Sequence, residues 1–137
     1  MEWAMAIMIV LGQFTGGVNT EGTSGDDAIK VYVRPVDADG SAIKAAGSLT
    51  VELFDLNLPE PDRRIGRWRF DPPALRKEWS ASFVGAFYSV TLPFPQPPAN
   101  ARLTCRVEFT DLLTGRSFVK QTDFGVKLKP ASRPATP

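Results

Sequence analysis

The segment Arg102–Asp111 limits the possible fold more than any other part of the chain. Its apolar residues, Leu103, Cys105, Val107 and Phe109, occupy every second position, and the residues between them are polar. Because successive side chains of a β-strand point to opposite faces, this period predicts a strand with a core on one side and water on the other. A helix would distribute both kinds of side chain around its circumference.

The same alternation predicts further strands on both sides of this segment. A turn at Asp111–Gly115 and a second extended run to Val126 predict a hairpin. Upstream, the predicted strands are Ile29–Val36, Gly47–Leu56, Arg64–Asp71 and Ala86–Leu92.

The strand predicted at Arg64–Asp71 has aromatic residues on one parity and arginines on the other. Trp68 and Phe70 are expected to face the core, and Arg67 and Arg69 to face solvent. We expect the arginines of this region to pair across the sheet with acidic neighbours such as Glu52.

One short helix is predicted near residues 72–79. Asp71 can cap its start, Pro72 suits the first helical position, and Leu75 and Trp79 are four residues apart and so share a face. We expect that face to close one end of the core.

Together these elements predict an all-β fold, an antiparallel immunoglobulin-like or transthyretin-like β-sandwich of six to seven strands with one short helix. The chain has 137 residues, which is the size of one domain. We expect residues 16–129 to form the sandwich, the proline-rich stretch 93–98 to cross between its sheets, and residues 130–137 to be a disordered tail.

Residues 1–15 form an apolar N-terminal segment with three possible roles. The apolar run Trp3–Leu11 is nine residues long, whereas a membrane-spanning helix needs about 20, so no transmembrane span is predicted. The run is the remnant of an export signal, a packed strand or helix of the fold, or a loose surface segment. No cysteine follows it closely, which excludes lipid attachment there.

Two features of the composition exclude whole classes of chemistry. The chain has no histidine, which removes the usual general base, the imidazole metal ligand and the Ser-His-Asp triad. Its single cysteine, Cys105, rules out an intrachain disulfide and a cysteine-rich zinc site, and its parity predicts a buried, unreactive thiol. The net charge of +1 gives no general attraction to nucleic acid, which we do not expect as a partner.

Acid–base catalysis by carboxylates is a minor alternative. Paired acids can act without histidine, and the candidate pairs are Asp55 with Glu52 and Asp71 with Glu78. Strand ends and helix capping explain these residues equally well. We therefore predict no enzyme, no catalytic residue and no cofactor.

A calcium site is a second alternative. The sequence Asp37–Gly40 begins like a calcium-binding loop, but the twelfth position is Ser48, where an EF-hand has glutamate. A looser site would pool aspartates from neighbouring loops, namely Asp26, Asp27, Asp37, Asp39 and Asp55. Because aspartate also stabilises turns, we favour a structural role for them and predict no metal ligands.

Two stretches resemble known families. Val33–Leu56 resembles the opening of transthyretin-like and carboxypeptidase-regulatory-like modules. Gly16–Leu128 resembles a bacterial envelope or lipoprotein-like domain of the type seen in planctomycetes, through residues 25–31, 64–70 and 109–116. This resemblance implies an exported protein, often with a lipid-bearing cysteine, and the chain departs from that pattern at its start. It implies no activity and no functional residue.

The expected function is that of a non-catalytic extracytoplasmic or envelope-associated β-sandwich that contacts another protein or an envelope polymer. The alternative is a small-molecule or carbohydrate-binding module that stacks its ligand on Trp68, Trp79, Phe87 or Tyr88. Exposed aromatic side chains would favour the alternative. The oligomeric state is not predicted.

Overall fold

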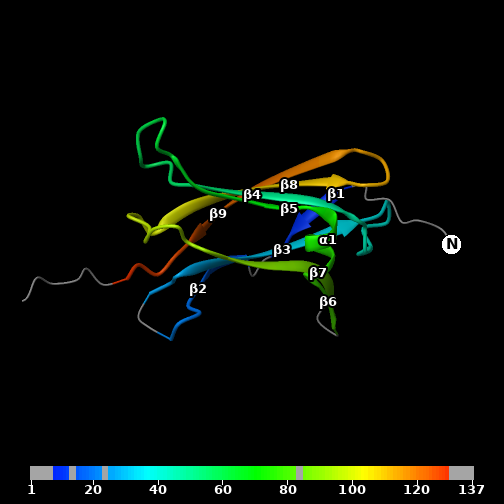
Figure 1. Ribbon diagram of the computed structural model, residues 1–137, viewed down its shortest axis with the longest axis horizontal. Helices are drawn as coiled ribbons and strands as arrows, with labels where there is room; N and C mark the ends of the chain where they lie inside the picture. The colour runs from blue at the N-terminus through cyan, green and yellow to red at the C-terminus, as the bar shows by residue number, and fades with distance from the viewer. Residues whose placement is uncertain (1–7, 13–14, 23–24, 83–84, 130–137) are drawn as a thin grey trace, which may run out of the picture.

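The computed structural model describes residues 8–12, 15–22, 25–82 and 85–129. Within these residues the chain forms two antiparallel sheets that lie over one another as a β-sandwich (Figure 1), which confirms the predicted fold class. The described residues contain nine strands and one short helix, where six to seven strands were expected. The additional strands are short ones near the N-terminus and after the helix.

The first sheet has five strands in the order β1-β3-β7-β6, with β2 also paired to β3. Both β1 and β2 pair with the same strand because they lie beside successive parts of it, β2 beside its start and β1 beside its end. The strand bounds are β1 Met8–Leu11, β2 Gly16–Val18, β3 Ala28–Val36, β6 Trp79–Ser82 and β7 Gly85–Pro93.

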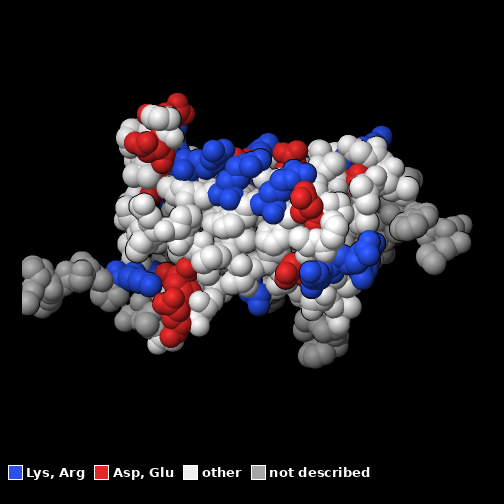
Figure 2. Space-filling model, viewed as in Figure 1, with Lys and Arg blue, Asp and Glu red and all other residues white. Residues whose placement is uncertain are grey.

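The second sheet has the order β5-β4-β8-β9, with bounds β4 Gly47–Phe54, β5 Arg64–Phe70, β8 Arg102–Asp111 and β9 Ser117–Gly125. Figure 2 shows Lys and Arg side chains along the layer where Figure 1 labels β5. On β5, Arg67 and Arg69 are exposed as predicted, whereas Trp68 and Phe70 pack against the core.

The chain crosses from one sheet to the other between β3 and β4, between β5 and β6, and between β7 and β8. The last of these crossings follows Pro93, where β7 ends, and contains the rest of the proline-rich stretch that the sequence predicts at this place, residues 94–98. Proline favours extended backbone without internal hydrogen bonds, which suits a connection that spans the edge of the sandwich.

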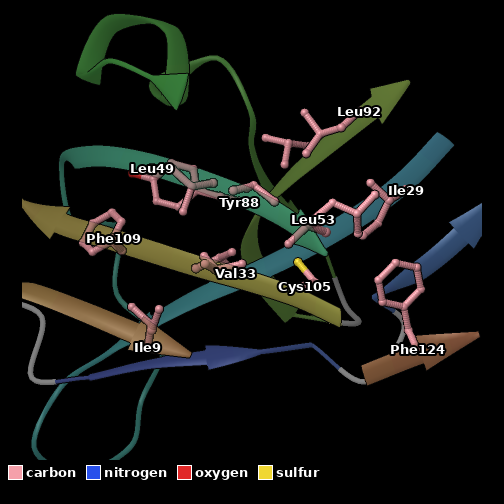
Figure 3. Packing of buried hydrophobic residues seen from close by; sticks show 14 of the residues in the cluster. Ile9, Ile29, Val33, Leu49, Leu53, Tyr88, Leu92, Cys105, Phe109 and Phe124 are labelled. Carbon is pink, nitrogen blue, oxygen red and sulfur yellow. The ribbon is translucent and has the colours of Figure 1, made fainter. Parts of the chain in front are cut away.

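The core lies between the sheets and consists of the apolar parity of the central strands (Figure 3). On β8, Cys105, Val107 and Phe109 are fully buried and Leu103 nearly so. The other strands contribute Ile29, Val31, Val33, Leu49, Val51, Leu53, Tyr88, Val90 and Leu92. Since every second residue of these strands faces inward, the other parity is left for the two outer faces.

The apolar N-terminal run contributes one strand to this core. Three alternatives were given for Trp3–Leu11. Its part Met8–Leu11 is a packed strand, β1. Ile9 is fully buried and lies in register with Pro35 of β3. Residues 1–7 and the predicted tail 130–137 lie outside the described residues. Across the described ranges, no helix has the length and apolar character needed to cross a membrane.

The helix is shorter than predicted. It spans Pro72–Arg76 as α1, and Trp79 is not helical but begins β6. Pairing explains the difference, because Trp79 lies in register with Tyr88 of β7 and its ring contacts that of Tyr88 with centroids 4.9 Å apart. Of the two residues predicted to share a helical face, Leu75 and Trp79, only Leu75 lies in α1. Its side chain is fully buried.

Asp71 occupies the N-cap position of α1, but its side chain makes no capping hydrogen bond. Its Oδ1 instead accepts a hydrogen bond from Nε of Arg69 at 3.0 Å. The predicted position of the cap is therefore correct and the predicted capping contact is wrong.

Candidate functional site

The outward parity of β3 and β7 forms a surface of aromatic and basic side chains. We call it the aromatic–basic face and define it by Lys30, Tyr32, Arg34 and Phe87. Tyr32 precedes the buried Val33, so the alternation of the strand turns it to the outside of the five-stranded sheet. The rings of Tyr32 and Phe87 meet edge to face, with centroids 5.1 Å apart and planes at 82°.

Cationic groups flank this ring pair on β3. Nζ of Lys30 lies 5.6 Å from the centroid of the Tyr32 ring, within the range of a cation–π contact. The guanidinium of Arg34 lies beside Gly85, where a Cβ would come within 2.8 Å of Nη2. Nε of Arg34 is buried and has no hydrogen-bond partner among the described residues. The face therefore combines aromatic area with positive charge.

A shallow hollow of about 440 Å³ lies on this side of the five-stranded sheet. It is lined by Lys30, Tyr32, Lys77, Glu78, Trp79, Ser80, Phe87 and Ser89. The lining combines the two outward-facing rings of Tyr32 and Phe87 with hydroxyl, ammonium and carboxylate groups, whereas the ring of Trp79 packs on Tyr88 at the core side. Such a surface can stack against a flat apolar group and form hydrogen bonds to polar groups at its rim.

The four aromatic residues predicted to stack a ligand do not lie together. Phe87 faces the hollow. Trp79 also borders the hollow, but its ring lies against that of Tyr88 and packs on the core. Trp68 is half-buried on β5 of the other sheet. Tyr88 is buried in the core, where its hydroxyl donates to the carbonyl oxygen of Ala45 at 2.6 Å and burial raises its pKa. Tyr88 is therefore not a stacking residue.

Tyr32 belongs to the site but was not predicted from the sequence. It lies on the polar parity of its strand between Lys30 and Arg34. A large aromatic residue among outward-facing charged residues is the sequence signal that could have identified it.

The first pair of candidate catalytic carboxylates, Glu52 and Asp55, have different hydrogen-bond partners in different places. Glu52 lies on the outer face of the four-stranded sheet, where its oxygens accept from Arg106 Nη1 at 2.9 Å and from Arg64 Nη1 at 3.3 Å. The contact with Arg64 confirms the predicted pairing of Glu52 with an arginine of β5, and Arg106 of β8 is an additional partner. Asp55 is buried and accepts from the side-chain amide of Asn100 at 2.7 Å and from a backbone N–H at 3.0 Å. Neither contact set suggests acid–base chemistry.

The second pair of carboxylates is divided in the same way. Asp71 binds Arg69, with Nε and Oδ1 3.0 Å apart. Glu78 instead lines the hollow beside Lys77 and Trp79. Of the four acids considered for catalysis, Glu78 is the one that lies at the aromatic–basic face.

The aspartates considered for calcium binding stabilise loops. Asp26 and Asp27 precede β3 and Asp37 and Asp39 follow it, so the two pairs lie at opposite ends of that strand. Asp27 accepts hydrogen bonds from the backbone N–H and the hydroxyl of Thr20, and these bonds help to lower its pKa. Among the described residues, no three side chains of metal-ligating type lie close together.

Cys105 is buried, and burial raises the pKa of its thiol to about 12. A thiol with so high a pKa carries almost no thiolate at neutral pH, and the thiolate is the reactive form. The structure therefore agrees with the buried, unreactive thiol expected from its parity.

No protein-family model, curated protein or solved structure matches this chain. The resemblances to transthyretin-like modules and to planctomycete-type envelope domains remain predictions. Function is therefore inferred from the geometry of the aromatic–basic face.

Proposed function

We propose that this chain is a non-catalytic, envelope-associated binding module that holds a protein or an envelope polymer on the outer face of its five-stranded sheet. The observation that carries the proposal is the contact between Tyr32 and Phe87 on that face, with Lys30 and Arg34 beside it. Both rings come from the paired strands β3 and β7. Side chains on paired strands are held more rigidly than side chains on loops, which favours a preformed binding surface.

The contacts of the acidic residues support a non-catalytic role. Glu52, Asp55 and Asp71 accept hydrogen bonds from separate sets of nitrogen donors at different places in the fold. A general acid–base pair requires two carboxylates that flank one substrate bond. The envelope location rests on the sequence resemblance of Gly16–Leu128 alone.

A carbohydrate ligand is the second candidate, because Tyr32 and Phe87 line one hollow together with Ser80 and Ser89. Aromatic rings offer flat apolar area to the faces of sugar rings, and hydroxyl groups can bond to the hydroxyl groups of sugars. The hollow of about 440 Å³ falls within the size range of small-ligand sites.

Sedimentation with an insoluble envelope fraction of the source organism tests the proposal. We expect the unmodified chain to sediment with the fraction, and Tyr32→Ser combined with Phe87→Ser to remain in the supernatant. A matched control combines Arg67→Gln with Val119→Ser, two exposed positions on the other sheet, and should sediment like the unmodified chain. Equal sedimentation of both variants, or none by the unmodified chain, would contradict the proposal.

Pretreatment of the envelope fraction separates the two candidate ligands. Digestion with a protease should abolish sedimentation if the partner is a protein. Digestion with glycan hydrolases should abolish it if the partner is a carbohydrate polymer. Soluble oligosaccharides should compete only in the second case.

A further inference from the structure

A second hollow lies at the end of the sandwich beside α1 and is separate from the aromatic–basic face. Its volume is about 320 Å³, and it is lined by Lys44, Ala46, Pro72, Arg76 and Tyr88. Figure 2 shows basic side chains gathered where Figure 1 labels α1. The lining therefore has two cationic groups, an aromatic ring and two small apolar groups.

The charge of this lining is of one sign. It contains Lys44 and Arg76 and no acidic residue. In the described part of the chain neither side chain forms an ion pair, and Asp71, at the start of α1, is bound by Arg69. By contrast, the hollow at the aromatic–basic face contains Glu78, and a third hollow of about 370 Å³ contains Asp55 and Asp62 with Arg64.

Each of the two cationic groups lies near an aromatic ring. Nζ of Lys44 lies 6.0 Å from the centroid of the Trp79 ring. Arg76 lies near enough to Tyr88 for its charge to oppose the larger effect of burial on the pKa of the phenol. The phenol hydroxyl of Tyr88 donates its hydrogen bond to the carbonyl oxygen of Ala45, so it cannot donate to a ligand at the same time. The unmatched polar groups of the hollow are therefore the two cations.

We propose that this hollow binds an oxyanion, the carboxylate or phosphate group of a ligand, between Nζ of Lys44 and the guanidinium of Arg76. A guanidinium presents parallel N–H donors that match two oxygens of either group, and an ammonium adds a point charge. The carbon atoms of the ligand would lie against Pro72 and Ala46. This site is independent of the proposed function, because it lies on other residues and needs no ligand on the outer face of the sheet.

NMR titration of the full chain with succinate, and separately with inorganic phosphate, tests this site. At low ionic strength we expect saturable shifts of the backbone amide signals of Lys44, Ala46 and Arg76. Tighter binding of succinate identifies a carboxylate site and tighter binding of phosphate a phosphate site, and either result supports the proposal. A linear response, or shifts spread evenly over all basic residues, would overturn it.

Charge-removing variants give the second readout. Arg76→Gln and Lys44→Gln should each weaken binding about tenfold or more, since a hydrogen bond between charged groups is lost. The matched control is Lys77→Gln, which removes the neighbouring exposed charge outside the hollow and should change affinity by less than about threefold. All three positions are exposed, so the fold should survive the changes. Equal weakening by Arg76→Gln and Lys77→Gln would show general charge attraction and reject the site.

Discussion

Phe109 shows how closely single residues fit in this core. It is fully buried on β8, and a Cβ at Gly47 of the neighbouring strand would lie 2.6 Å from its Cζ. This contact leaves no room for a side chain at Gly47. Removing the Phe109 ring would leave a cavity that the rigid strands around it cannot fill.

We predict that Phe109→Ala lowers the free energy of unfolding by about 3–5 kcal/mol, because it loses buried area and creates a cavity. Urea denaturation monitored by tryptophan fluorescence measures this change. The control is Val119→Ala on β9, where the side chain is exposed and the expected change is within about 0.5 kcal/mol. Similar losses for both variants would show that the core is not where the structure places it.

The buried thiol of Cys105 should make the stability of the fold depend on pH in the alkaline range. Burial raises the pKa of its thiol from an ordinary 9.0 to about 12. Above pH 9 the unfolded chain loses the thiol proton while the folded chain keeps it, so stability that is complete below pH 9 falls as the pH rises toward 12. Between about pH 8 and about pH 10 this group alone should lower the free energy of unfolding by about 1.4 kcal/mol.

Denaturation of the unmodified chain and of Cys105→Ala at both pH values isolates this effect, since the other titrating groups are common to the two proteins. The variant should be less stable at the lower pH because of the lost volume, and should lose less stability as the pH rises. Parallel pH profiles would mean that the thiol is accessible to solvent.

The short helix α1 packs on the core through one buried side chain. Leu75 is its buried residue, and the helix is too short to be stable alone. We predict that Leu75→Ala costs about 2–5 kcal/mol of unfolding free energy. Ala74→Ser, at an exposed position of the same helix, should cost less than about 1 kcal/mol. Thermal denaturation compares the two, and equal melting temperatures would show that α1 does not anchor the connection between the sheets.

The sequence predicts the long strands well and the short elements poorly, for a physical reason. The alternation of β8 extends over Arg102–Asp111, and the predicted bounds agree with the structure. Over Pro72–Arg76 there is little more than one helical turn, so a helical period cannot be distinguished. Trp79 was therefore assigned to the helix, although its pairing with Tyr88 makes it the first residue of β6.

At the scale of the whole molecule, the candidate site depends on pairing that the sequence does not reveal. The face forms because β3 pairs with β7, strands that are distant in the chain. Tyr88 and Phe87 are consecutive in a predicted strand, so the alternation places them on opposite sides of it. The alternation could not show that Tyr32 contacts Phe87, because that contact requires the order and register of the strands.

The central claim is that one face of β3 is buried in the core and the other belongs to the proposed binding surface. Single cysteines introduced in a Cys105→Ala background by Lys30→Cys, Tyr32→Cys, Val31→Cys and Val33→Cys test it through their rates of reaction with a thiol reagent. The structure predicts rapid reaction at positions 30 and 32, which are partly exposed, and slow reaction at positions 31 and 33, which are fully buried. Rates without this alternation would contradict both the core and the binding face.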